Sequence, residues 1–112
     1  MNTIRHDQRK QITEAFRGYA AKRGTVSYAD MLDSDKAVAQ TLSVLHAEGQ
    51  DRIVAAVDAV YFKDPTKPLH RSDIDERVIS YSMTHYVSTA SIYRWLSIAR
   101  RIYWAILYHT VE

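Results

Sequence analysis

The chain has 112 residues, a net charge of +2 and no cysteine, so it has the size of one domain and can form neither a disulfide nor a thiolate metal site. Apolar residues make up 46% of the sequence and charged residues 25%, which is typical of a globular protein rather than a disordered one. Residues 1–9 are polar and lack a signal-peptide core, and the apolar-rich segment 102–108 is far shorter than the ~20 residues that span a bilayer. We therefore expect a cytoplasmic protein with no membrane partner.

Three helices are predicted in the first half of the chain. Residues 8–23 carry apolar side chains every three or four positions, and Gly24 ends this helix. Ser34 is a candidate N-cap for a second helix, which Gly49 closes. Residues 50–62 repeat the apolar stripe and form the third.

A loop with two prolines at 64–68 separates these helices from the remainder, because proline cannot continue a helix. Ser72 is the expected cap of the next helix, with Asp75 in the place of a capping-box acid. The inward side chains of that helix are expected to be Ile74, Val78, Ile79 and Met83. Only residues 25–28 resemble a strand, so we predict an all-α fold of about five helices. The chain is interpreted as a single helical domain, 1–112, with an N-terminal helical part at 1–49 and a second part at 50–112.

The second part has the features of a helix-turn-helix. Residues 84–86 break the helical pattern. Val87 is then expected to pack into the core directly before Ser88, the expected N-cap of the last helix. Ile92 and Trp95 follow at one-turn spacing and are expected to lock the two helices together.

The turn itself departs from the usual pattern. His85 occupies an apolar position and Tyr86 replaces the turn glycine, whereas Ser82 supplies the small residue at the helix crossing. A longer turn, with Met83 as the last apolar plug of the first helix, is the interpretation that we prefer.

The remaining side chains at the start of the last helix point outward and suit a major groove: Thr89, Ala90, Tyr93, Arg94 and Ser97. Arginine binds guanine through two hydrogen bonds, hydroxyl groups bind bases or phosphates, and methyl groups meet the thymine methyl. Ser88 opens the helix at an end that favours phosphate, and Arg100 and Arg101 are expected to contact phosphates further along.

Residues 50–107 resemble the C-terminal half of the RinA/ArpU-like late-gene transcriptional activators from phages of Gram-positive bacteria, which is similar to region 4 of sigma factors. Three segments carry the resemblance: the helix at 52–62 with its terminal Tyr61-Phe62, the helix at 73–83, and the run from Val87 to Leu96. Residues 1–49 match no part of that family.

The resemblance implies a sequence-specific transcriptional regulator acting in a bacterial host cell. It assigns a DNA-facing role to Ser88, Thr89, Ala90, Tyr93 and Arg94, and a packing role to Ile92 and Trp95. Duplex DNA is the implied partner, and RNA polymerase is a candidate partner. The C-terminal aromatics Tyr103, Trp104 and Tyr108 are too many for one helix face, which makes a homodimer a further candidate.

The alternative is a helical protein–protein adaptor that does not read DNA. The small net charge favours this alternative, although residues 1–30 and 70–112 are each mildly basic while 31–69 are acidic. The five histidines lack metal-ligand spacing, and there is no glycine-rich phosphate loop or nucleophile motif. We therefore predict no enzymatic activity, no metal and no cofactor.

Overall fold

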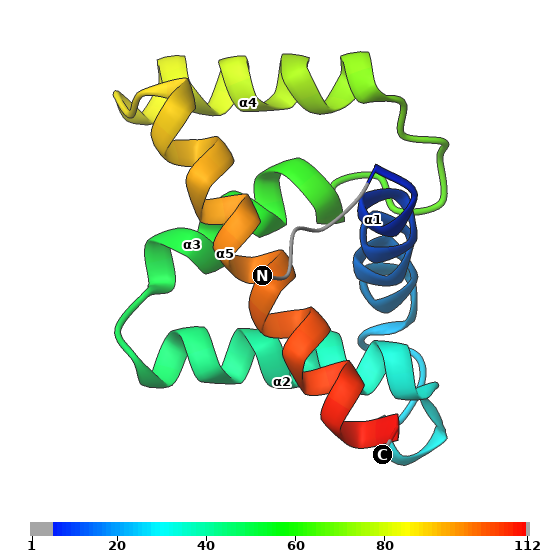
Figure 1. Cartoon of the computed structure of the whole chain (residues 1–112). Coiled ribbons are helices and arrows are strands. Elements are labelled where there is room, and N and C mark those ends of the chain that lie inside the picture. The colour runs from blue at the N-terminus through cyan, green and yellow to red at the C-terminus, as the bar shows by residue number, and fades with distance from the viewer. Residues whose placement is uncertain (1–5, 112) are drawn as a thin grey trace.

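The computed structural model describes residues 6–111, which form five α-helices and no strand (Figure 1). The all-α prediction is therefore confirmed for this part of the chain. The elements in order are α1 (His6–Lys22), the 3₁₀ turn η1 (Tyr28–Asp30), α2 (Asp33–Ala47), α3 (Asp51–Val57), the π-helical turn η2 (Asp58–Phe62), α4 (Arg71–His85) and α5 (Thr89–Val111). The strand candidate at 25–28 forms a turn that leads into η1.

Two glycines end the first two helices, as predicted. Gly24 follows α1 with a φ of 84°, and Gly49 follows α2 with a φ of 72°. Both values lie in the left-handed region, which a side chain with a Cβ atom adopts at a cost.

The predicted N-caps Ser34 and Ser72 are wrong, because α2 and α4 each begin two residues earlier than expected. The carboxylate of Asp35 accepts a hydrogen bond at 3.2 Å from the backbone N–H three residues before it. Asp73 does the same at 2.9 Å, and it takes the place predicted for Asp75. These acids bind the N-cap N–H groups, and the start of each helix follows the acid rather than the serine.

A single hydrophobic core draws residues from all five helices and from η2. Phe16 of α1 lies fully buried at its centre. Its ring centroid is 5.6 Å from that of Tyr61, 6.3 Å from that of Phe62 and 5.4 Å from that of Tyr103. These contacts join α1 to η2 and to α5, so the two sequence halves are packed on one another.

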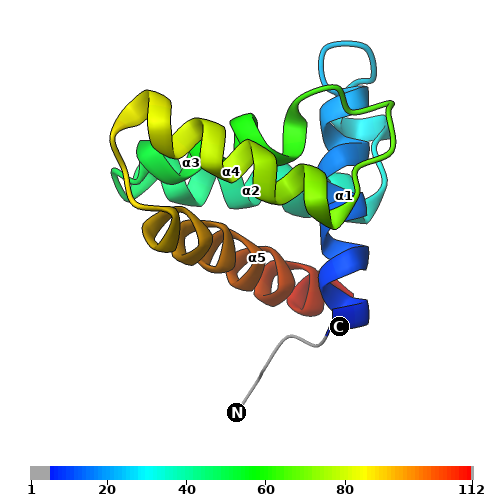
Figure 2. The same ribbon diagram turned by 90° about the horizontal axis from the view of Figure 1, so that it is seen from above.

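Helix α5 lies diagonally across α2 and α3, while α4 runs along one end of the molecule (Figure 1). Viewed from above, α5 forms one side of the molecule, and no other described helix covers its outer face (Figure 2). The fold therefore buries one face of α5 and leaves the opposite face accessible.

Helix α4 packs mainly against η2 and α5. Val78 is fully buried and Ile74 is half-buried, but Ile79 and Met83 are exposed, which contradicts the prediction that they point inward. The reason is the position of α4 at the end of the bundle, where only a narrow stripe of the helix meets the core.

Candidate nucleic-acid interface

Helices α4 and α5 are joined by a turn of three residues, 86–88. Tyr86 adopts the left-handed conformation, with φ 55° and ψ 44°. The Val87 N–H then donates to the Ser82 carbonyl at 3.2 Å, and the Ser82 hydroxyl donates to the Val87 carbonyl. The longer turn that we preferred is wrong: α4 continues to His85, Met83 is exposed, and Tyr86 takes the conformation of the usual turn glycine.

Ser88 caps α5, as predicted. Its Oγ accepts a hydrogen bond from the Ser91 N–H at 3.1 Å and donates one to the Ser91 hydroxyl at 2.9 Å. Val87, directly before the cap, is half-buried against the core. The cap fixes where α5 begins and therefore which of its side chains face outward.

The side chains predicted to face outward do share one side of α5, since all of them fall within about 140° at 100° per residue. Ser97 is half-buried, and the other four are exposed: Thr89, Ala90, Tyr93 and Arg94. Arg101, further along the same side, is exposed as well. On the opposite side Ile92 is fully buried, and Trp95 is half-buried with the guanidinium of Arg52 5.6 Å from its ring centroid. Neither Arg94 nor Arg101 is in an ion pair among the described residues.

Tyr93 has a different environment from the other outward residues. Its hydroxyl donates a 2.5 Å hydrogen bond to the carboxylate of Asp75 on α4. This hydrogen bond, together with desolvation and the charge of Asp75, raises the pKa of Tyr93 to about 12, against a smaller opposing effect of Arg71. The phenol therefore stays protonated at neutral pH and ties α5 to α4, while its ring remains 41% exposed.

Arg100 and Arg101 are separated by the fold, although both were predicted to contact phosphates. Arg101 is exposed. Arg100 is half-buried and donates to the Tyr61 hydroxyl at 2.7 Å, and its buried Nε has no partner among the described residues. Its guanidinium lines a pocket rather than the outward face of α5.

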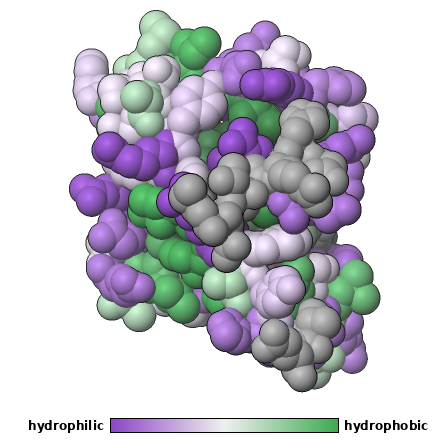
Figure 3. Space-filling model, in the orientation of Figure 1, coloured by the Kyte–Doolittle hydropathy of each residue, from purple (hydrophilic) through white to green (hydrophobic). Residues whose placement is uncertain are grey.

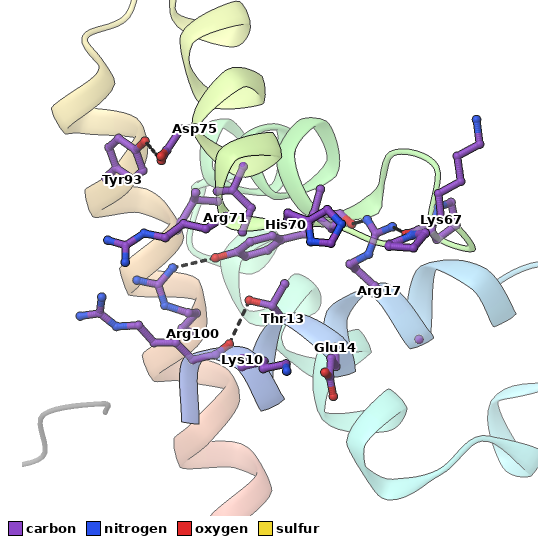
Figure 4. A pocket seen from close by; sticks show the side chains of 18 residues that line it. Lys10, Thr13, Glu14, Arg17, Lys67, His70, Arg71, Asp75, Tyr93 and Arg100 are labelled. Carbon is purple, nitrogen blue, oxygen red and sulfur yellow. Dashed lines mark hydrogen bonds between the residues drawn. The ribbon is translucent and has the colours of Figure 1, made fainter. Parts of the chain in front are cut away.

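That pocket has a volume of about 790 Å³ and lies between α1, the loop after η2, the start of α4 and the inner edge of α5 (Figure 4). Basic side chains from segments far apart in the sequence line it, among them Lys10, Lys67 and Arg71. No local motif in the sequence connects these residues, so the pocket could not be predicted from it.

Two further arginines, also missed from the sequence, hold the loop that forms one wall. Arg17 of α1 donates to the backbone carbonyls of Tyr61, Lys63, Asp64 and Lys67. Arg77 of α4 donates to the carbonyls of Val60 and Lys63, both at 2.9 Å. Burial, and then the charge of Arg77, lower the pKa of Arg17 while Asp64 opposes them; a guanidinium nevertheless stays charged at neutral pH.

The face that carries α5 is mixed in character (Figure 3). Hydrophilic side chains border it on both sides, and hydrophobic ones gather beside the middle of the face. Among the described residues, no group of three or more histidine, aspartate or glutamate side chains is arranged to hold a metal ion. No helix in the same part of the chain combines the length and apolar character needed to cross a membrane.

Comparisons of the chain with protein families, with curated protein sequences and with solved structures found no match.

Proposed function

We propose that the chain binds duplex DNA in a sequence-specific manner through the outward face of α5 and regulates transcription, in a phage or prophage setting. The supporting observation is the first half of α5 itself. A serine-capped helix follows a three-residue turn, and its outer face carries short polar groups and arginines that no described side chain covers.

The roles follow from the chemistry of base edges and phosphates. Arg94 is the candidate for a guanine, because its side chain is exposed and is in no ion pair among the described residues. Thr89 and Ala90 supply a hydroxyl and methyl groups at the exposed start of the helix. Arg101, two turns beyond Arg94, meets a phosphate where α5 leaves the groove.

Two residues change role relative to the sequence-based expectation. The Tyr93 hydroxyl is bonded to Asp75, so in this proposal Tyr93 positions α5 against α4 and offers only its ring to DNA. Arg100 is bonded to Tyr61 and belongs to the pocket.

The first experiment is selection of bound sequences from a pool of random duplex DNA, with the purified chain at two salt concentrations. We expect an enriched motif whose binding weakens as salt rises, because cations that meet phosphates release counterions. A palindromic motif would indicate a homodimer with two half-sites. Absence of both enrichment and salt-sensitive binding would contradict the proposal.

The sharper test uses single variants on the selected sequence. Arg94→Ala is expected to cost about 1–3 kcal/mol of binding free energy and to relax the preference at one base pair. Arg101→Ala is expected to weaken binding to all sequences alike and to reduce the salt dependence. Lys63→Ala removes one exposed cation from the loop after η2 and serves as the charge-matched control. Equal losses in all three variants would mean that α5 does not read bases.

A second candidate function, a protein–protein adaptor, is favoured by the exposed apolar side chains of α4. Ile79 is 51% exposed, Met83 73% and Tyr86 95%, and their spacing places them along one side of the helix and its end. Such a stripe suits a helical partner surface, for which RNA polymerase is a candidate. Under this function, Met83→Ser reduces capture of purified RNA polymerase while Arg94→Ala does not.

A further inference from the structure

The pocket between α1, α4 and α5 carries a strong excess of positive charge. Six basic side chains line it: Arg9, Lys10, Arg17, Lys67, Arg71 and Arg100. Only two acidic side chains do so, Glu14 and Asp75, and Asp75 already accepts the Tyr93 hydroxyl. The whole chain has a net charge of only +2, so this charge is concentrated rather than general.

None of the basic pocket side chains forms an ion pair within the described part of the protein. The ion pairs found there are Lys22 with Asp35, Arg23 with Asp58, and His46 with Asp51, all outside the pocket. Gathering like charges without counterions is unfavourable. An anion that fills the pocket would relieve this repulsion, which is the usual arrangement of a phosphate site.

Part of the site is held rigid before any ligand arrives. Arg17 is only 7% exposed and is fixed by its four carbonyl partners. Arg100 is fixed by the Tyr61 hydroxyl and has no described partner at its buried Nε. Figure 4 draws the side chains of Arg71 and Arg100 on the side of the pocket that carries Tyr93, and the charge of Arg71 acts on the Tyr93 hydroxyl. Arg71 is also the first residue of α4, whose N-terminus adds partial positive charge.

The size and the remaining lining limit the ligand. A volume of about 790 Å³ lies within the range of small-molecule sites, which is about 300–1,000 Å³. Leu69, Ile74 and Leu96 give the pocket apolar surface beside the cations. The combination fits a phosphate group attached to an organic moiety better than a bare monovalent anion.

We propose that this pocket binds a multiply charged phosphate group. Two sources have this chemistry: a free polyphosphate compound, and successive phosphates of a DNA strand that passes beside α5. Phosphate binding in this pocket does not require α5 to read bases, because Arg100 is the one basic pocket residue that was also predicted to contact DNA.

The test is isothermal titration calorimetry of the full chain with inorganic triphosphate at low salt, followed by a random-sequence duplex in the same buffer. Arg71→Gln and, separately, Arg9→Gln each remove one exposed pocket cation. Arg52→Gln is the matched control, because it removes an exposed arginine of α3 that lies outside both the pocket and the outward face of α5. Arg17 and Arg100 are left unchanged because they anchor the fold, and thermal melting confirms that each variant is folded.

For a free polyphosphate we expect one saturable site for triphosphate, weakened at least about tenfold by Arg71→Gln or Arg9→Gln and less than about twofold by Arg52→Gln. If DNA is the source, triphosphate fails to saturate, and the two pocket variants weaken binding of the random duplex more than Arg52→Gln does. The proposal is overturned if all three variants act equally on both ligands, or if neither ligand is affected by the pocket variants. Failure of sequence-specific DNA binding leaves the triphosphate result intact, so the two proposals fail separately.

Discussion

The guanidinium of Arg17 donates hydrogen bonds to four backbone carbonyl oxygens between residues 61 and 67. These carbonyls belong to the end of η2 and to the proline-containing loop, where no helix continues to pair them. Buried carbonyls without donors are unfavourable, so one cation replaces several missing backbone partners. The loop, and with it one wall of the basic pocket, depends on this side chain.

We therefore expect Arg17→Met, which keeps the length of the side chain, to lower the free energy of unfolding by roughly 2–4 kcal/mol. Arg9→Met is the matched control on the same helix, because Arg9 is exposed, and it should change stability by less than about 0.5 kcal/mol. Urea unfolding followed by circular dichroism measures both. Equal stability of the two variants would show that the loop holds its shape without Arg17.

Phe16 and Arg17 are both buried, but only the burial of Phe16 could be predicted from the sequence. Phe16 lies on the apolar stripe of α1, so its burial follows from periodicity. Arg17 is its neighbour and is also buried, but no sequence pattern says that loop carbonyls 44 to 50 positions away will surround it. A buried charge is explained by its partners, which only the tertiary structure identifies.

At the scale of elements, the turn between α4 and α5 carries a strained residue. Tyr86 has a φ of 55° and is 95% exposed, so packing of its side chain does not compensate the backbone strain. The left-handed conformation costs an ordinary residue about 1–2 kcal/mol, whereas glycine adopts it freely. The backbone of this turn therefore favours glycine, whereas the sequence has a tyrosine there.

Tyr86→Gly is accordingly expected to stabilise the chain by about 0.5–1 kcal/mol, after subtraction of the greater freedom of glycine in the unfolded state. Tyr86→Ala removes the same ring without relieving the backbone and should give no gain. Thermal and urea unfolding of the three proteins check this difference. If the alanine variant were stabilised as much as the glycine variant, the exposed ring rather than the backbone would be the cause.

The five helices could be predicted because their signals are local. Apolar periodicity located all five, and Gly24, Gly49 and Ser88 marked three of their ends. The predicted starts at Ser34 and Ser72 failed because an acid three residues beyond the true N-cap competes with a nearby serine. The burial of Ile79 and Met83 was mispredicted because periodicity does not reveal how much of a helix face finds a partner.

At the scale of the whole molecule, the two candidate sites differ in how much of each could be predicted from the sequence. The outward face of α5 comes from one continuous run, so helical geometry was enough to group its residues. The basic pocket combines residues near positions 9–17, 67–71 and 100. Their proximity depends on the packing of α1 against η2 and α5, which no motif encodes.

The division of the sequence at residue 49 does not correspond to a division of the core. Phe16 contacts rings from η2 and α5, and α2 packs against α5 across the same interior. Each half therefore buries part of its apolar surface against the other. We therefore expect the chain to unfold as one cooperative unit.

This expectation can be measured with two probes that report on different parts of the molecule. Far-UV circular dichroism follows all helices, whereas tryptophan fluorescence follows the packing of α5, because Trp95 and Trp104 are the two tryptophans of the chain. Both signals should give the same urea midpoint. Phe16→Ala, made in α1, should shift both midpoints together and lower the free energy of unfolding by about 3–5 kcal/mol, because it removes a fully buried ring. Helical signal that persists after the fluorescence transition is complete would instead show that residues 1–49 form a separate unit, and the cavity left by Phe16 would then move only one of the two transitions.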